Sequence, residues 1–239
     1  MTRLSVNINK IATIRNARGG NVPDVTKAAA DCENFGAEGI TVHPRPDERH
    51  IRYADVRSIR PIIKTEFNIE GNPIPSFIDL VCEVLPDQVT LVPDAPDAIT
   101  SNAGWDTVKN REFLSSMCAL FKSKGIRCSI FIDPNPLMAE GAKACGADRV
   151  ELYTAAYAER YPEDRESAIA DYVRTAERAR ELGLGLNAGH DLSLENLEYF
   201  IRRIPWTDEV SIGHAIISDA LYLGLEKTIQ AYLSKIKIF

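Results

Sequence analysis

Acid–base chemistry is the first chemistry that the polar residues of this chain suggest. His43 and His190 each close a short apolar run, Glu70 ends another, and Glu151 lies inside a fourth. Imidazole exchanges protons near neutral pH, and burial can raise the pKa of a carboxyl group until that group acts as a base. We therefore expect His43, Glu70 and His190 to form an acid–base set. Two alternatives stay open: Glu70 can instead cap the next helix, and Glu151 can instead pair with a buried arginine.

A second group of residues could hold small anions. Arg18 follows the first apolar run in a glycine-containing segment, and Arg45 and His50 follow the run that ends at His43. A guanidinium can bind a phosphate through two parallel hydrogen bonds. Gly189 and Gly213 permit close backbone approach near two other histidines. These residues suggest two separate sites for phosphorylated ligands.

The composition limits the classes of partner. The formal net charge is −6 and charges of both signs are interspersed, so neither nucleic acid nor an anionic membrane surface is expected. The N-terminus lacks the apolar core of a signal peptide, and no run approaches the roughly 20 apolar residues of a membrane span, which favours the cytoplasm. The five cysteines form no CxxC pair, so we expect reduced and mostly buried thiols.

The elements that must position these side chains alternate regularly. Short β-type runs are separated by amphipathic stretches, such as residues 24–35 and 76–85, which is typical of a parallel sheet with crossover helices. No glycine-rich dinucleotide motif follows the first run. We expect one α/β domain over residues 1–239, a single (β/α)8 TIM barrel with extra helical elements. The predicted strands are residues 4–8, 39–42, 66–69, 88–91, 128–132, 149–152, 185–187 and 209–212.

In such a barrel the active site lies at the carboxyl ends of the strands. Asn7 and Asn9 end the first predicted strand on this face. Long loops are expected there over residues 93–104 and 154–164. All four histidines are also predicted to lie in loops or strand ends on this face, namely His43, His50, His190 and His214.

Several short motifs, each at a different predicted strand–helix junction, carry a family resemblance. They are Val6-Asn7-Ile8, Ile11-Ala12-Thr13, Arg15-Asn16-Ala17-Arg18-Gly19, Gly39-Ile40-Thr41-Val42-His43, Arg49-His50-Ile51, Asn68-Ile69-Glu70, Leu91-Val92-Pro93, Phe131-Ile132-Asp133, Val150-Glu151-Leu152, Leu186-Asn187-Ala188-Gly189-His190 and Ile212-Gly213-His214-Ala215-Ile216-Ile217. In this combination and order the sequence resembles the pyridoxine 5'-phosphate synthase (PdxJ) family over essentially its whole length.

The resemblance implies an enzyme that condenses 3-amino-2-oxopropyl phosphate with 1-deoxy-D-xylulose 5-phosphate. The products are pyridoxine 5'-phosphate, inorganic phosphate and water, and no metal or organic cofactor is implied. By motif, His43 and Glu70 are implied as proton acceptors, His190 as the proton donor, and Glu151 as a stabiliser of transition-state charge. The implied contacts to the amino-ketone phosphate are Asn7, Arg18, the backbone of Asp191, Gly213 and His214, and those to the pentulose phosphate are Arg45, His50 and Thr100.

The chain departs from the family pattern at two places. Many members carry Asp-His where this chain has Asn9 and Lys10, so these two residues are further candidates for contact with the pentulose phosphate. Asp191 stands where members often have glycine, a change that costs little if the contact is a backbone N–H. The resemblance also implies a homo-octamer.

Three other functions fit parts of the pattern. A metal-dependent barrel enzyme for sugar phosphates could use the histidines and Glu70 as ligands, although no HxH or HExxH spacing occurs. An aldolase could form a Schiff base on Lys10, which borohydride trapping would reveal. A non-catalytic sugar-phosphate sensor would bind both precursors without turnover and would not need Glu70.

Overall fold

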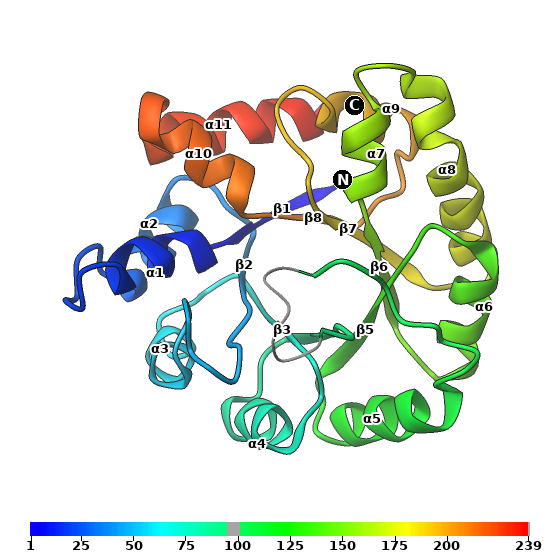
Figure 1. Ribbon diagram of the computed structural model, residues 1–239, viewed down its shortest axis with the longest axis horizontal. Helices are drawn as coiled ribbons and strands as arrows, with labels where there is room; N and C mark the ends of the chain where they lie inside the picture. The colour runs from blue at the N-terminus through cyan, green and yellow to red at the C-terminus, as the bar shows by residue number, and fades with distance from the viewer. Residues whose placement is uncertain (95–100, 239) are drawn as a thin grey trace.

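The strands of the computed structural model, which describes residues 1–94 and 101–238, close into one parallel barrel (Figure 1). Their order around the barrel follows the chain, and β8 pairs with β1 through neighbours such as Ile212 and Val6. The predicted (β/α)8 fold is thus confirmed. The strands are β1 (Arg3–Asn7), β2 (Gly39–Val42), β3 (Glu66–Gly71), β4 (Gln88–Leu91), β5 (Arg127–Ile132), β6 (Arg149–Tyr153), β7 (Gly185–His190) and β8 (Glu209–Ile212).

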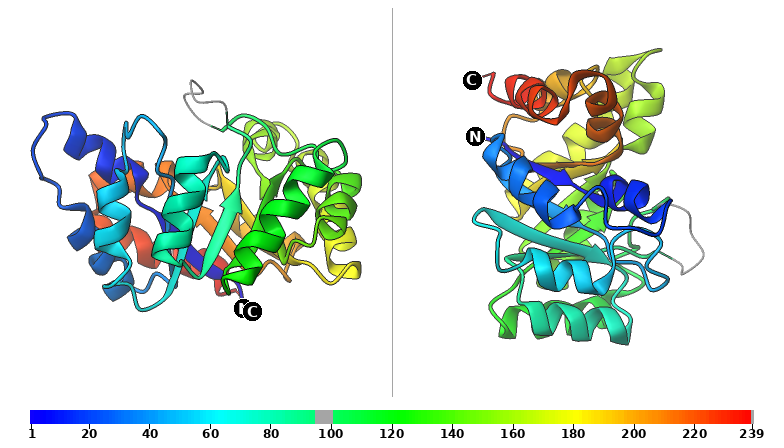
Figure 2. Two further views of the ribbon diagram at one scale, coloured as in Figure 1. Left: turned by 90° about the horizontal axis from the view of Figure 1, so that it is seen from below. Right: turned by 90° about the vertical axis from the view of Figure 1, so that its left-hand side faces the viewer.

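Helices surround the barrel, and extra helices follow β1, β6 and β8 (Figure 1). Seen from the side, the chain starts at the lower end of the barrel, and the loops after the carboxyl ends of the strands gather at the upper end (Figure 2). The helices are α1 (Asn9–Asn16), α2 (Val25–Asn34), α3 (Tyr53–Ile59), α4 (Pro75–Val84), α5 (Arg111–Ser123), α6 (Pro136–Ala144), α7 (Ala155–Arg160), α8 (Arg165–Glu181), α9 (Leu197–Arg203), α10 (His214–Leu223) and α11 (Leu225–Ile236).

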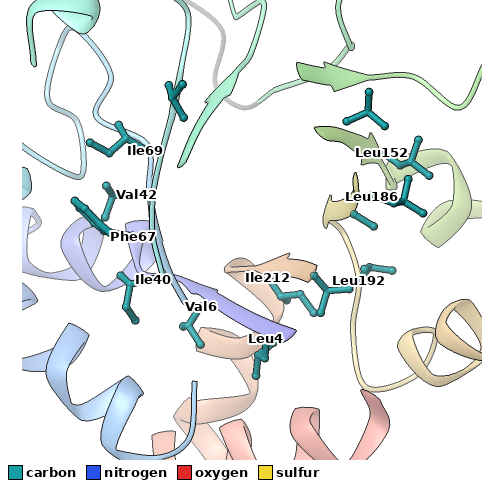
Figure 3. Close-up of a cluster of buried hydrophobic side chains, with 14 of the residues drawn as sticks. Leu4, Val6, Ile40, Val42, Phe67, Ile69, Leu152, Leu186, Leu192 and Ile212 are labelled. Carbon is teal, nitrogen blue, oxygen red and sulfur yellow. The ribbon is translucent and has the colours of Figure 1, made fainter. Parts of the chain in front are cut away.

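The apolar core lies between the strands and the helices, not inside the barrel. Side chains alternate along each strand, so one set faces the helices and the other faces the barrel interior. Figure 3 shows the first set, for example Leu4, Ile40 and Ile212, extending from the strands toward the helices. The second set is largely polar: Ser5 and Thr41 are hydrogen-bonded at 2.7 Å, and further buried members are Asn68, Thr90, Ser129, Asn187 and Ser211. Barrel interiors are more often filled by Val, Ile and Leu, so this interior is unusually suited to polar chemistry.

Some local predictions are wrong. Arg18 lies in a turn, as expected of a loop after the first strand, but the helix α1 over residues 9–16, which was not predicted, separates it from β1. His214 is the first residue of α10, not a loop residue, and the expected loop over residues 154–164 contains α7. Strand β7 continues to His190, because its backbone stays paired with both β6 and β8.

Candidate active site

A cavity of about 360 Å³ opens at the carboxyl ends of the strands. Twelve of the residues singled out in the sequence line it, so the structure brings most of the predicted site together. They are Asn7, Asn9, Lys10, His43, Arg45, His50, Glu70, Glu151, His190, Asp191, Gly213 and His214. Arg18 is exposed beyond α1 and is not among the lining residues, and Thr100 lies outside the described residues.

Glu70 projects into the cavity from β3. The Asn7 amide donates to its Oε2 at 3.5 Å, and the Ser211 hydroxyl donates to its Oε1 at 3.4 Å. Burial raises the pKa of Glu70 to about 8, and the nearby carboxylates of Asp94 and Glu209 act in the same direction. The helix-capping alternative is wrong, because α4 begins at Pro75 after the N-cap Ile74, without a side-chain cap. Glu70 can therefore hold a proton near neutral pH and release it on demand.

Glu151 lies deeper in the same cavity, on β6. Its side chain accepts a hydrogen bond from the Thr90 hydroxyl at 3.5 Å. Burial raises the pKa of Glu151 well above its usual range, and the charge of Glu70 raises it further. A Cβ atom at Gly189 would stand 2.3 Å from Glu151 Oε1, so a larger residue at this position would clash with the carboxyl group where it now lies. Within the described residues no arginine forms an ion pair with Glu151, so the paired-arginine alternative is wrong.

His43 stands between two carboxyl groups at the mouth. Its Nδ1 lies 3.9 Å from Glu70 Oε2, and its Nε2 lies 3.6 Å from Asp94 Oδ2. Its backbone N–H donates to the Asn9 side chain at 2.9 Å, which fixes the start of the loop after β2. Burial lowers the pKa of His43 well below its usual value, and the charge of Arg45 lowers it further. The resting imidazole is therefore neutral, as a proton acceptor must be.

His190 closes β7 on the opposite side of the cavity. Its backbone φ is 100°, a region that non-glycine residues adopt rarely and that clusters at functional sites. Its Nδ1 lies 2.6 Å from the carboxylate of Asp191, and its ring packs edge-on against Tyr153. The Asp191 backbone N–H, predicted to bind substrate, donates to the Thr154 hydroxyl at 3.2 Å.

Arg45 and His50 supply cationic and N–H groups from the loop after β2. The Arg45 guanidinium donates to Asp94 Oδ2 at 2.5 Å, and the Ser101 hydroxyl donates to the same oxygen at 2.8 Å. The His50 Nδ1 accepts the Ile51 backbone N–H at 2.9 Å, so the neutral ring carries its proton on Nε2. The pKa of His50 is lowered to about 4, mainly by burial and next by the charge of Arg45. His50 can thus donate a hydrogen bond to a bound anion without being charged.

The Arg15 and Asn16 side chains hold this loop in place. Arg15 is buried, and its guanidinium donates to both carboxylate oxygens of Asp55, at 2.5 and 2.8 Å. Arg15 and Asn16 both donate to the backbone carbonyl of His50, at 3.1 and 2.8 Å. Sequence pattern alone could not predict this role, because the partners lie 34 to 40 residues away along the chain. Asp94 was also missed, although it is the first charged residue after β4 and so had the same signal as the predicted residues.

Lys10 adds a second cation to this side of the cavity. It lies at the start of α1 and lines the cavity, and its charge contributes to lowering the pKa of His50. The two residues that replace the family's Asp-His pair thus have separate environments: Asn9 braces the His43 backbone, while Lys10 faces the cavity.

A second anion-binding environment lies where α10 begins. Gly213 is the N-cap of α10, and a Cβ atom there would stand 3.0 Å from the Asn7 Cβ. Glycine therefore allows the start of the helix to approach β1 closely. The first N–H groups of a helix have no partner within it and attract anions. His214 at the first helical position adds a side chain beside them.

Two features that bear on the alternatives are absent from the described residues. No group of three or more His, Cys, Asp or Glu side chains in this part of the chain is arranged to hold a metal ion. None of its helices combines the length and the apolar composition that crossing a bilayer requires. The cysteines are free thiols, as predicted, and all but Cys82 are buried.

Fold and site together define a (β/α)8-barrel enzyme that works by proton transfer on anionic substrates. The family model described as pyridoxal phosphate biosynthesis protein PdxJ matches residues 4–238. The chain therefore belongs to the PdxJ family, and its function is pyridoxine 5'-phosphate synthesis.

Individual relatives agree with this assignment. The pyridoxine 5'-phosphate synthase of Bacteroides thetaiotaomicron is 67% identical over 232 residues, covering 97% of this chain and 98% of the relative. The synthase of Christiangramia forsetii is 64% identical over 237 residues, covering 99% and 100%. Among solved structures, phosphoribosyl anthranilate isomerase from Thermotoga maritima superposes with a TM-score of 0.65 at 15% identity, covering both chains fully. At that identity the likeness shows the barrel fold alone.

Proposed function

We propose that this cavity, carried by one catalytic domain of residues 1–239, is the site of the synthase reaction. There 3-amino-2-oxopropyl phosphate and 1-deoxy-D-xylulose 5-phosphate condense to pyridoxine 5'-phosphate, inorganic phosphate and water. One observation carries the proposal: two buried carboxyl groups, Glu70 and Glu151, face the same cavity as His43 and have raised pKa values. Imine formation, dehydration, phosphate loss and ring closure are successive proton transfers, which such groups accelerate.

The four acid–base residues have distinct proposed roles. Neutral His43 accepts a proton in its resting state, and Glu70 accepts one after it has passed on the proton that burial keeps on it; their separation of 3.9 Å lets both act on the same bound substrate. His190, beside the Asp191 carboxylate, donates a proton from the opposite side. Glu151 responds to positive charge that develops in the transition state: such charge favours the ionised form of the carboxyl group and so opposes its raised pKa, and in a water-poor site the resulting attraction is strong.

The two phosphates are proposed to bind in different environments. Asn7, Gly213 and His214 at the start of α10 suit the phosphate of the amino ketone. The backbone of Asp191 is proposed to contact the amino-ketone phosphate as well. Arg45 and His50, with Lys10 in place of the family's histidine, suit the pentulose phosphate, for which we also propose a contact from Asn9. The roles that the resemblance implies for Arg18 and Thr100 stay predictions.

The decisive experiment mixes the purified, metal-stripped protein with both precursors and measures pyridoxine 5'-phosphate and inorganic phosphate. We expect both products in equal amounts, and a loss of about 10²- to 10⁴-fold in kcat for Glu70→Gln. Glu112→Gln, an exposed change on α5, is the matched control and should leave kcat unaltered.

The alternatives give other results. Tight binding of either precursor without product would favour the sensor and contradict the proposal. Activity that returns only with a stoichiometric metal ion would favour the metal-dependent enzyme. Borohydride trapping of a substrate on Lys10 would favour the aldolase.

Assembly into a homo-octamer is also part of the proposal. Leu221 and Tyr222 at the end of α10 are 73% and 91% exposed, and large apolar side chains left in water often mark a contact between subunits. Light scattering of the purified protein measures its mass directly. A monomer at micromolar concentration would contradict this part of the proposal.

A further inference from the structure

Asp94 lies between the acid–base residues and the anion-binding residues of the site. It follows β4 and is 7% exposed. One of its oxygens, Oδ2, accepts from Arg45 at 2.5 Å and from Ser101 at 2.8 Å, and faces His43 Nε2 at 3.6 Å. Its backbone carbonyl accepts a hydrogen bond from the Asn72 side chain at 2.8 Å, which holds the backbone of Asp94 in place. Two donors thus hold the carboxylate in place, and a third holds the backbone of the same residue.

The position of Asp94 gives the two nitrogens of His43 different surroundings. Nε2 faces the Asp94 oxygen that accepts from the Arg45 guanidinium, so the favourable arrangement has N–H on this side. Nδ1 faces Glu70, whose carboxyl group retains a proton to higher pH than usual and can offer it to a lone pair. A carboxylate, an imidazole and a second carboxyl group are thus aligned.

We propose that Asp94 is a positioning residue for the synthase reaction: its carboxylate keeps the proton of neutral His43 on Nε2 and leaves Nδ1 to exchange protons with Glu70 and substrate. The inference rests on the proposed function of this site. When Nδ1 takes a proton from a substrate O–H or N–H group, the imidazolium that forms is stabilised by Asp94. The same proton returns to a departing oxygen, so His43 ends the cycle neutral.

The Asp94 carboxylate also affects how Arg45 can bind a phosphate. The guanidinium of Arg45 is already satisfied by Asp94 before any phosphate arrives, so a phosphate must compete with this carboxylate. Loss of the Asp94 charge should therefore weaken proton transfer without weakening the binding of the pentulose phosphate. If Asp94 only held the loop in shape, its loss would instead weaken binding of the pentulose phosphate and leave proton transfer unchanged.

The titratable and charged groups facing His43 come from four places in the fold. They are Glu70 from β3, Asp94 after β4, His190 from β7, and Arg45, Arg49 and His50 from its own loop.

The test compares the native protein with Asp94→Asn, which keeps the size and one acceptor oxygen but removes the charge. We expect kcat to fall by about 10²-fold, with the KM for the pentulose phosphate unchanged or lower. Asp87→Asn is the matched control, because it makes the same change just before the other end of β4, where Asp87 pairs with Arg60. It should leave both kinetic constants unaltered. Asp94→Glu restores the charge and should recover at least about tenfold of the lost kcat.

A second readout does not depend on turnover. In protein labelled with ¹⁵N-histidine, the midpoint at which His43 takes up its second proton is followed by NMR, with His43→Gln for assignment. The Asp94 carboxylate favours the charged imidazolium, so its removal in Asp94→Asn should move the midpoint to lower pH. Asp94→Glu should keep it near the native value, which preserves the test if the Asn variant does not fold.

Two results would overturn the proposal. A raised KM with unchanged kcat would mean that Asp94 only orders Arg45. A His43 midpoint that is the same in all variants would mean that Asp94 does not act on the imidazole. Absence of product from the native protein would contradict the proposed function instead, and the NMR titration would still decide the role of Asp94.

Discussion

The two ends of the barrel interior contain buried glutamates with opposite surroundings. At the floor, where the strands begin, Glu66 forms ion pairs with Arg3 at 2.7 Å and with Arg127. At the mouth, Glu70 comes four residues later on the same strand, and within the described residues its only ion-pair neighbour is His43. Burial alone would raise the pKa of Glu66, but Arg127, Arg3 and Arg149 outweigh it and bring the pKa below its usual range.

The difference shows what lets a buried carboxyl group keep its proton near neutral pH. Burial raises the pKa of both glutamates, and arginine partners reverse the effect at one end only. Glu209 supports this account from within the floor: its nearest cation, Arg3, is 3.7 Å away, and burial raises its pKa to about 8. Close arginine partners, rather than the end of the barrel, therefore decide whether a buried glutamate keeps its proton.

The largest expected effect comes from replacing glutamate by glutamine in two separate variants, one at the mouth (Glu70) and one at the floor (Glu66). Glu70→Gln should lose activity by at least about 10²-fold and should not lose stability, because a neutral amide replaces a group that is already difficult to ionise. Glu66→Gln should keep its activity within about threefold and lose about 3 kcal/mol of unfolding free energy, because its arginines lose their buried partner. Steady-state kinetics and urea denaturation measure both quantities. Similar results for the two variants would remove the distinction between floor and mouth.

The pH dependence of stability should also have opposite signs at the two ends. The folded pKa of Glu70 is about 8 and lies above its unfolded value, so its contribution is complete at low pH and is lost as the pH rises toward 8. Glu70→Gln should therefore gain in melting temperature relative to the native protein between about pH 5 and 8. The folded pKa of Glu66 is lowered, so its contribution is lost as the pH falls through that pKa.

Glu66→Gln should accordingly differ from the native protein at neutral pH and approach it in acid. Melting curves at several pH values for the two variants and the native protein check both trends. A Glu70→Gln advantage that shrinks with rising pH would contradict the raised pKa at the mouth.

The smallest expected effect concerns Thr90, which lies between floor and mouth. Its hydroxyl is within hydrogen-bond distance of Asn68 at 3.1 Å and of Glu151 at 3.5 Å. Thr90→Val keeps the shape but removes a donor that favours the ionised form of Glu151, so kcat should fall by about three- to tenfold. Thr41→Val is the control, because Thr41 bonds Ser5 and Asn68 but no carboxylate. Equal losses in both variants would assign the effect to packing.

The sequence predicted the barrel and most of the mouth because each strand is a short apolar run followed by a polar residue. His43, Glu70 and His190 were found in this way, and all three line the cavity. The pairing partners were not predictable, since Arg15 meets Asp55 across 40 residues and Asp94 meets Arg45 across 49. Local periodicity records which face a side chain takes but not which distant residue it contacts.

The most direct test of the account is a ¹³C NMR titration of protein labelled at its glutamate carboxyl groups. The resonance missing from Glu70→Gln should titrate with a midpoint of about 8, and the resonance missing from Glu66→Gln should titrate below 4.5. A Glu70 midpoint at or below that of Glu66 would contradict the claim that Glu70, unlike the arginine-paired Glu66, holds a proton for catalysis.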